Sequence, residues 1–441
     1  MTRIATNGSP GPGRRLHGAL SGALSLALVA VLIAGCGGGG SDSEADAQTV
    51  ASDTASPDTS SPDSSTGSDT AAGTNLSLLA TVGDAIFADQ SLSASGQMSC
   101  ETCHDPVRGH AGDGPFGVPA GGPALDTFGF RKSPGIRYLR FAPAFGFVTG
   151  RNGDAQQPSG GLFWDGRADS LEAQAGGPFL NPREMANASR AEVVAKLAAA
   201  PYATQLLQAG GLTSFADVDA VFDTMTAALA AYQREDAGFA SFDSKFDRVM
   251  RGEDRFTPSE DRGLRAFRDP VRGNCASCHS LDVPAGADGP LFTDFSHQAL
   301  GVPRNAAIPD NADPNFFDLG LCGPSRNDLT GRTDLCGRFK TPSLRNVALT
   351  APYFHNGRFE TLEEVVRFYA LRDIEPQRFY PTDATGQVIV FDDLPAFLRG
   401  NVTRQAPFGG RVGNVPRLSE ADIVDIVAFL RTLTDTTPAA P

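Results

Sequence analysis

The amino-acid sequence predicts a mainly α-helical fold in which long irregular loops connect the helices. Several segments carry apolar residues at intervals of three or four positions, which is the spacing of one helix face. No strand ladder is visible. The chain has 441 residues, of which 49 are glycine and 31 are proline, and this content predicts extensive loop structure. A chain of this length is sufficient for about two domains.

The N-terminal region is predicted to lie outside the fold. Residues 1–35 have the pattern of an export signal, with a basic start and an apolar run, Ala19–Ala34, that is too short for a stable transmembrane helix. The run leads into Leu-Ile-Ala-Gly-Cys, which resembles a bacterial lipobox with Cys36 as the lipidated residue. An ordinary signal peptide with an unrelated cysteine is the alternative. We therefore expect a periplasmic protein that a lipid anchors to a bacterial membrane.

Residues 36–75 are predicted to form a disordered acidic tether. They are rich in Gly, Ser, Thr, Asp and Pro, and they contain too few large apolar side chains to offset the entropy of ordering. The formal net charge of the chain is −14, and the basic clusters of a nucleic-acid-binding protein are absent from the sequence. This acidity suits a basic or weakly docked electron carrier as partner, or it only aids solubility.

Five helices are predicted in the folded part of the chain. Thr257 and Glu260 form a capping box before the fourth helix, with Pro258 at its first helical position. In the fifth helix, apolar residues such as Ile423 and Ile426 share one face. In chain order, the predictions are Leu78–Phe87, Ala191–Ala199, Asp217–Gln233, a helix that ends near Arg268, and a C-terminal helix that Ser419 caps.

Two Cys-x-x-Cys-His motifs carry the clearest chemical signal. This motif is the signature of c-type haem attachment, in which two thiols bind the porphyrin and the histidine ligates the iron. A zinc site would need further cysteine or histidine pairs at ligand spacing, and a redox dithiol does not explain both histidines. We therefore predict two covalently bound haem c groups, with these attachment residues and axial ligands: Cys100, Cys103, His104, Cys275, Cys278 and His279.

The helices and the haem motifs together predict two similar domains. A cytochrome c domain uses one helix before its haem motif and one near its C-terminus to hold the porphyrin. We therefore expect two cytochrome c-like haem domains at residues 76–250 and 251–435. Of the seven cysteines, Cys322 and Cys336 then remain, and in an oxidising compartment they are predicted to form a disulfide that closes a short loop.

Several longer stretches resemble the bacterial di-haem cytochrome c peroxidases, the family that includes MauG. They lie in the family's order between about Leu78 and Leu433, and they read Phe163-Trp-Asp-Gly-Arg-Ala168, Leu171-Glu-Ala-Gln-Ala175, Asn181-Pro-Arg-Glu-Met185, Phe339-Lys-Thr-Pro-Ser-Leu-Arg-Asn346 and Ala351-Pro-Tyr-Phe-His-Asn-Gly357. The resemblance implies an enzyme that reduces hydrogen peroxide with electrons from a small periplasmic carrier, such as a cytochrome c or a cupredoxin. Family relatives are often homodimers.

Three residues acquire catalytic roles from this resemblance. Glu184 resembles the family's distal glutamate, which moves a proton between the oxygens of peroxide. Gln174 resembles the neighbouring amide, which positions peroxide and stabilises charge on the departing oxygen. Trp164, the only tryptophan of the chain, resembles the indole between the two haems. Without the resemblance, Glu184 reads as a helix cap or the partner of an arginine, and Trp164 reads as a packing residue.

The sixth ligand of the second haem departs from the usual family pattern. Typical members supply a methionine from the helix that here runs Leu362–Tyr369, whereas this chain has tyrosine at that position and no methionine after Met250. MauG-like members carry tyrosine there. A tyrosinate stabilises ferric iron and lowers the reduction potential. We therefore expect Tyr369 to ligate the iron; if it is only a core residue, His297 and His355 are the remaining candidates, although His355 resembles a family histidine near a haem propionate.

Two further departures concern the first haem and a metal ion. Between Gly112 and Trp164 the sequence contains no histidine that could block the iron, and His110 follows His104 too closely to reach the opposite face. The first haem is therefore predicted to have a vacant face as made. Family members also bind calcium through an asparagine and two carbonyl groups, here those of Thr350 and Pro352. The asparagine position corresponds to Lys132, whose ammonium opposes a bound cation, so calcium is doubtful.

Three functions remain open from the sequence. The first is a peroxidase that reduces hydrogen peroxide to water with electrons from a small periplasmic carrier. The second is a MauG-like oxidase that uses peroxide to modify Trp or Tyr of a partner protein, and Tyr369 and the open first haem favour its mechanism. The third is a plain electron-transfer cytochrome, which predicts two six-coordinate irons and a dispensable Glu184.

Overall fold

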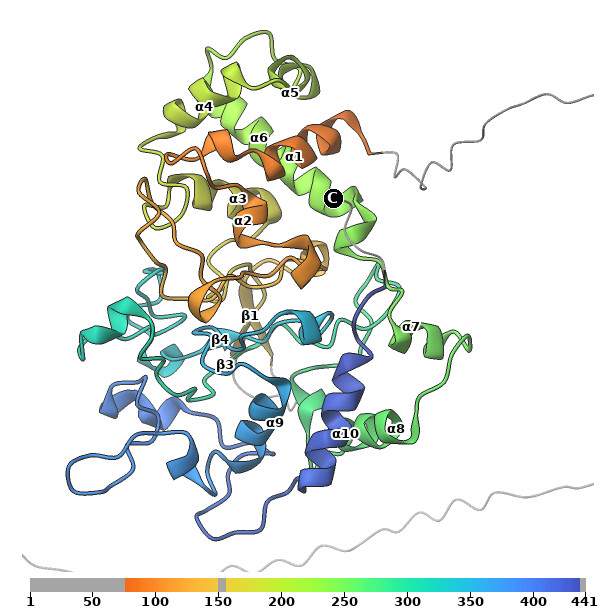
Figure 1. The fold of residues 1–441 in the computed structure, drawn as a ribbon, viewed down its shortest axis with the longest axis vertical. Coiled ribbons are helices and arrows are strands. Elements are labelled where there is room, and N and C mark those ends of the chain that lie inside the picture. The colour runs from red at the N-terminus through yellow and green to blue at the C-terminus, as the bar shows by residue number, and fades with distance from the viewer. Residues whose placement is uncertain (1–75, 150–155, 437–441) are drawn as a thin grey trace, which may run out of the picture. The chain divides into compact units, whose positions relative to one another are not determined.

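The computed structural model of the protein describes residues 76–149 and 156–436. The predicted signal peptide at 1–35, the lipidated Cys36 and the tether at 36–75 lie outside the described residues. Helices are the dominant regular structure of the described part, which confirms the prediction of a mainly α fold (Figure 1). None of these helices is both long and apolar enough to span a membrane.

The α-helices differ widely in length, and the longest, α6, has 18 residues. Short 3₁₀ turns and irregular loops connect them. The helices of the described residues are α1 (Leu78–Ala88), α2 (Cys100–Cys103), α3 (Leu171–Leu180), α4 (Arg190–Ala199), α5 (Ala203–Ala209), α6 (Val218–Glu235), α7 (Lys245–Met250), α8 (Pro258–Arg268), α9 (Leu362–Leu371) and α10 (Glu420–Arg431).

The five helices predicted from periodicity and capping are confirmed as α1, α4, α6, α8 and α10. At α8, the Thr257 hydroxyl accepts a hydrogen bond from the Glu260 amide, while the Glu260 carboxylate accepts one from the Thr257 amide. This reciprocal capping satisfies amides that the first helical turn leaves without partners. The same reciprocal capping occurs at the start of α10, between Ser419 and Asp422.

The sequence did not predict α3, α5 and α7, nor the four-residue α2. In α3, Pro178 and two glycines lie inside the helix, and these residues ordinarily argue against one. The helix forms because Ser170 caps its start, with its hydroxyl accepting from the Ala173 amide at 3.2 Å, and because Leu171 and Phe179 are buried against neighbouring elements. α7 and α5 have six and seven residues, too few for a clear apolar period.

Two short antiparallel ribbons also occur, although no strand ladder was predicted. β1 (Gly146–Thr149) pairs with β2 (Gln156–Ser159), and β3 (His297–Gln298) pairs with β4 (Phe339–Lys340). Strands of two to four residues are too short for an alternating pattern to appear in the sequence. Cys322 and Cys336 form the predicted disulfide, with their Cα atoms 5.0 Å apart.

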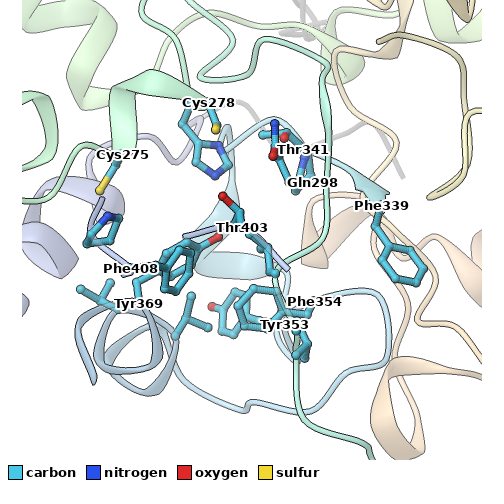
Figure 2. Close-up of a pocket in the computed structure, with 18 of the residues that line it drawn as sticks. Cys275, Cys278, Gln298, Phe339, Thr341, Tyr353, Phe354, Tyr369, Thr403 and Phe408 are labelled. Carbon is cyan, nitrogen blue, oxygen red and sulfur yellow. The ribbon is translucent and has the colours of Figure 1, made fainter. Parts of the chain in front are cut away.

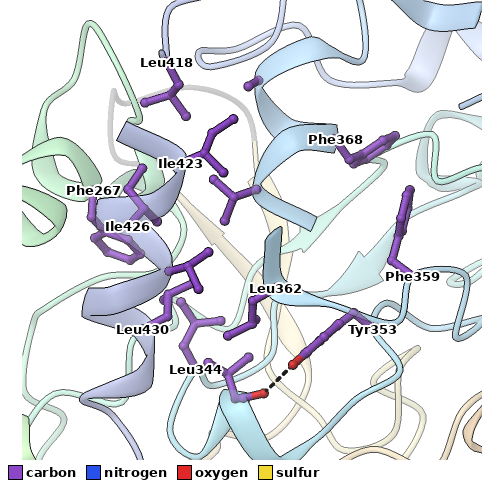
Figure 3. Packing of buried hydrophobic residues seen from close by; sticks show 14 of the residues in the cluster. Phe267, Leu344, Tyr353, Phe359, Leu362, Phe368, Leu418, Ile423, Ile426 and Leu430 are labelled. Carbon is purple, nitrogen blue, oxygen red and sulfur yellow. Dashed lines mark hydrogen bonds between the residues drawn. The ribbon is translucent and has the colours of Figure 1, made fainter. Parts of the chain in front are cut away.

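Two large buried clusters occur, and apart from Phe246 their residues lie on opposite sides of the predicted domain boundary in the sequence. The first is formed mainly by apolar residues of α1, α3, α4 and α6. The second combines α8, α9 and α10 with aromatic loop residues, and Figure 3 shows Phe267, Ile426 and Leu430 among them. All these residues belong to one compact unit, and the division at residue 250 stays a prediction.

A glycine allows a close helix crossing in each cluster. α1 packs against α6 at Gly83, where a Cβ atom would lie 2.0 Å from the carbonyl oxygen of Ala228 (Figure 1). α8 packs against α10 at Gly263, where a Cβ atom would lie 1.9 Å from the carbonyl oxygen of Asp425. Both helices precede a haem motif in the sequence.

We predict that Gly83→Ala lowers the free energy of unfolding by about 1–3 kcal/mol, because the added methyl group forces α1 away from α6. Chemical denaturation of the haem-loaded protein would measure the change. Gly331→Ala is the control, because no atom lies within 4 Å of its added Cβ. Equal stability of the two variants would contradict the tight crossing.

Candidate functional site

Each Cys-x-x-Cys-His motif lines one large cavity. The Cys100 cavity also contains Glu184 and Gln174 in its wall. The Cys275 cavity is the more apolar of the two and contains Tyr369. Figure 2 shows Cys275 and Cys278 on one side of this second cavity, with Tyr353 and Phe354 on the opposite side.

Local hydrogen bonds position the two motifs. Ser99 caps α2, and its amide donates to the Thr102 hydroxyl at 3.0 Å, so the two cysteines of the first motif lie one helical turn apart. Asn274 adopts a left-handed backbone conformation just before the second motif. Its side-chain amide donates to the carbonyl of Ala406 at 3.0 Å, which ties the motif to the loop that carries Phe408.

The histidine of each motif is held in one orientation. The Nδ1 atom of His104 donates to the carbonyl of His110 at 3.1 Å, and that of His279 donates to the carbonyl of Phe292 at 2.9 Å. Because a carbonyl only accepts, both rings carry their proton on Nδ1, and Nε2 remains for a metal. Burial lowers the pKa of both rings and so favours the neutral, ligating form. Two thiols, one such nitrogen and a large cavity fit a c-type haem at each motif.

Tyr369 extends from α9 into the Cys275 cavity and stacks on Phe408, with ring centroids 5.1 Å apart. Its hydroxyl has no hydrogen-bond partner among residues 76–149 and 156–436. Burial raises the pKa of this hydroxyl, and the nearby Cys278 and Cys275 thiols add to the effect. An unpartnered phenol that lines the same cavity as Cys275 and Cys278 fits an iron ligand, so the predicted role of Tyr369 agrees with its position.

The alternative ligands have different positions. His297 lies on β3 and is not part of the described lining of the Cys275 cavity. His355 does line that cavity, but its ring stacks on Phe339 at 3.6 Å and its Nε2 lies 3.9 Å from a carboxylate oxygen of Asp393. No methionine appears in the described lining. These positions favour Tyr369 over both histidines.

Glu184 and Gln174 lie together in the wall of the Cys100 cavity. The side-chain amide of Asn181 donates to Oε1 of Glu184 at 2.6 Å, which leaves Oε2 for another partner. Burial raises the pKa of Glu184 from its ordinary value of 4.5, while the Arg167 charge and the Asn181 hydrogen bond oppose this shift. Glu184 makes no ion pair within the described residues, so the alternative of an arginine-paired carboxylate does not apply.

Apart from His104, no histidine contributes to the described lining of the Cys100 cavity. His110 stacks on Phe239 at 4.3 Å, and its Nδ1 accepts a hydrogen bond from Arg137 at 3.2 Å, so it lies behind the proximal histidine. Two methionines, Met98 and Met185, also line the cavity. A methionine sulfur also ligates haem iron, whereas the sequence interpretation considered only histidine as a blocking ligand.

Trp164 is the one residue in the described linings of both cavities. Its indole N–H donates to the carbonyl of Lys132 at 2.8 Å, and its own carbonyl accepts from the Lys340 amide at 2.8 Å. Next to it, Asp165 is paired with Arg131, which also contacts Asp318. The indole is therefore held at the wall that the two cavities share, where the family resemblance places it.

Sequence reasoning missed Asn181 and Arg131. Asn181 lies three residues before Glu184 at the end of α3, a spacing that brings a side chain back toward a helix end, but α3 itself was not predicted. Arg131 joins Asp165, which is next to Trp164, to Asp318 of the Cys275 cavity. No local pattern reveals such a pairing, because the partners lie 34 and 187 residues away.

The position expected for calcium does not fit a bound cation. The Lys132 ammonium donates to the carbonyl of Thr350, one of the two carbonyls that the family resemblance assigns to the metal. This amino group occupies the place of a metal ion at the carbonyl, and in its protonated form it repels a divalent cation. Within the described ranges, no group of three or more His, Cys, Asp or Glu side chains could hold a metal.

Comparison with known proteins agrees with this geometry. The family model for di-haem cytochrome c peroxidases matches residues 78–255. The methylamine utilization protein MauG of Paracoccus denitrificans is 40% identical over 297 residues, which cover 66% of this chain and 74% of that protein. The cytochrome c peroxidase Ccp of Escherichia coli is 32% identical over 290 residues, which are 65% of this chain and 51% of that protein.

Solved structures extend the similarity to more of the chain. The diheme peroxidase BthA of Burkholderia thailandensis has a TM-score of 0.73 and 37% identity, and the match covers 84% of this chain and 91% of BthA. A BthA variant in which methionine replaces a tyrosine has a TM-score of 0.74 at the same identity. The chain therefore belongs to the di-haem cytochrome c peroxidase family, which includes MauG, and it is an oxidoreductase that acts on peroxide.

Proposed function

We propose that this protein is a periplasmic peroxidase that reduces hydrogen peroxide to water with electrons from a small periplasmic carrier. One observation carries the proposal: Glu184 and Gln174 line the same cavity as Cys100, Cys103 and His104, without a second histidine in its described lining. This arrangement supports a haem with one vacant face beside a carboxylate and an amide.

The haem at His104, when bound, supplies the iron at which the O–O bond of peroxide is broken. Glu184 supplies the proton transfer, because its Oε2 accepts a proton from one peroxide oxygen and returns it to the other. Its raised pKa brings the carboxylate closer to the pH at which such transfer is efficient. The Gln174 amide, which has no hydrogen-bond partner among the described residues, donates toward the departing oxygen.

A haem bound in the Cys275 cavity would supply electrons to the first haem through the shared wall. The reduction of peroxide to two molecules of water consumes two electrons and two protons. Trp164 gives an aromatic path between the cavities, and the acidic surface of the chain suits a basic carrier.

Glu184→Gln should lower kcat/KM for hydrogen peroxide by about 100- to 10,000-fold, because the amide cannot accept the proton. In the wild-type protein, activity should fall as the pH drops through the pKa of Glu184, and this loss should occur at a higher pH than for an ordinary glutamate. Steady-state kinetics across a pH series would measure both effects.

Glu172→Gln is the matched control for this experiment. Glu172 lies on α3 but pairs with Arg234 at 2.6 Å and does not line the Cys100 cavity. We expect wild-type kinetics from this variant. If Glu184→Gln turned over peroxide as fast as the control, the protein would carry electrons without the proposed catalysis, which is the function of a plain electron-transfer cytochrome.

A second function, the peroxide-driven oxidation of Trp or Tyr in a partner protein, is favoured by Tyr369. Its phenol lies in the Cys275 cavity, whose described lining contains no methionine. A second haem with a tyrosinate ligand would resist reduction by an ordinary electron carrier. The relative with 40% identity is a MauG protein, which supports the same alternative.

Tyr369→Met should raise the midpoint potential of the second haem, because a neutral thioether replaces an anionic ligand. Redox titration with electron paramagnetic resonance would show a changed low-spin signal, while a high-spin signal from the first haem persists. Tyr353→Phe is the control, since Tyr353 lines the same cavity but donates to the Val347 carbonyl at 3.1 Å. An unchanged midpoint potential of the second haem would exclude Tyr369 as its ligand. A first haem that is low-spin, and becomes high-spin only when Met98 or Met185 is replaced, would show that a methionine occupies the face predicted to be vacant.

We also propose that Cys36 carries a lipid that anchors the protein in the periplasm. The lipobox-like stretch before Cys36 and the acidic tether after it support this location. When cells that produce the protein are extracted with detergent and the phases are separated, the protein should partition into the detergent phase. Cys36→Ala should abolish that partitioning. A wild-type protein found entirely in the aqueous periplasmic fraction would contradict the anchor.

A further inference from the structure

Lys132 is a buried lysine without a carboxylate partner. Its residue is 5% exposed, and no ion pair to it occurs within the described part of the chain. Its amino group instead donates to the carbonyl oxygen of Thr350, 218 residues away. The carbon stem packs at Gly117, where a Cβ atom would lie 2.9 Å from Cγ of Lys132 and 3.0 Å from Cδ of Pro352.

A second cation binds the same loop. The guanidinium group of Arg108 donates to the carbonyl of Ala351 at 3.0 Å, one residue beyond the carbonyl that Lys132 contacts. Two side-chain cations therefore face two successive carbonyl groups. Carbonyl oxygens carry partial negative charge, and they are among the ligands that Ca²⁺ accepts.

The backbone of Lys132 joins the same loop to the indole at the shared wall. Its amide donates to the carbonyl of His355 at 2.7 Å, and its carbonyl accepts from the Trp164 indole at 2.8 Å. Lys132 lines the Cys100 cavity, whereas Tyr353 and His355 line the Cys275 cavity. One residue thus connects both cavities with the aromatic ring between them.

We propose that Lys132 is a positioning residue whose amino group takes the place of a metal ion between the two haem cavities. The relative placement of the cavities is then independent of divalent cations in this protein. The inference rests on membership of the di-haem family and on the contacts of Lys132, and it does not depend on which substrate delivers the electrons. A lysine that only fills space would leave the calcium affinity of the protein unchanged when it is replaced.

The wild-type haem-loaded protein gives the first test. Isothermal titration with Ca²⁺ should detect no binding, and dialysis against a chelator should leave the electron paramagnetic resonance signals of both haems unchanged. Both measurements use the wild-type protein, so they test the proposal even if a substitution at Lys132 prevents folding. One Ca²⁺ bound per chain, or a signal that changes on chelation and returns with Ca²⁺, would overturn the proposal.

The second test removes the ammonium and offers a neutral oxygen. Lys132→Asn should bind Ca²⁺ at least about tenfold more tightly than the wild-type protein, since a repelling charge is replaced by an amide oxygen. Without Ca²⁺, the resonance signals of both haems should be perturbed, and added Ca²⁺ should restore them. A variant that gains no Ca²⁺ affinity, or whose two signals match the wild type without Ca²⁺, would refute the assigned role.

Lys340→Met is the matched control. Lys340 is half-buried beside Trp164, and its amino group donates to the carbonyl of Gly161 at 2.7 Å, but it does not contact the Thr350 loop. Its removal should create no Ca²⁺ binding. If Lys340→Met gained the same Ca²⁺ affinity as Lys132→Asn, the effect would follow from the general loss of a buried charge, and the specific position of Lys132 would be refuted.

Discussion

The wall that the two haem cavities share is the constraint on which the rest of the structure depends. Trp164 lies in both linings, and the hydrogen bond from its indole to the Lys132 carbonyl holds it there. For the electron transfer proposed between the two haems, a ring that could rotate away would not provide a fixed path. The pairing of Asp165 with Arg131 and the contact of Lys132 with Thr350 hold the segments on both sides of this wall.

The two cavities have the same proximal side and different distal sides. In both, a histidine donates through Nδ1 to a backbone carbonyl, which leaves Nε2 free to ligate. On the distal side, the Cys100 cavity has Glu184, a carboxylate whose pKa is raised by burial, whereas the Cys275 cavity has the phenol of Tyr369. The two cavities therefore share the residues that attach a haem but differ in the side chain opposite, and the proposed roles of Glu184 and Tyr369 rest on this difference.

Much of the fold could be predicted because its signals are local. The capping box at Thr257, the apolar period of α6 and both haem motifs each lie within a few residues of sequence. α3 was missed because Pro178 argues against a helix, and tertiary packing overrode that local preference. The short ribbons and the smaller helices carry too few residues for any period to be visible.

The sequence by itself determined the chemistry of attachment, the helices that precede each haem motif, and the residue types available for catalysis. Only the tertiary structure decided that Tyr369, rather than His297, reaches the Cys275 cavity, and that the Lys132 amino group lies on the Thr350 carbonyl. The physical reason is separation along the chain. Capping and attachment act between neighbours, whereas a cavity wall joins segments hundreds of residues apart, and their meeting depends on how the helices pack around the buried clusters.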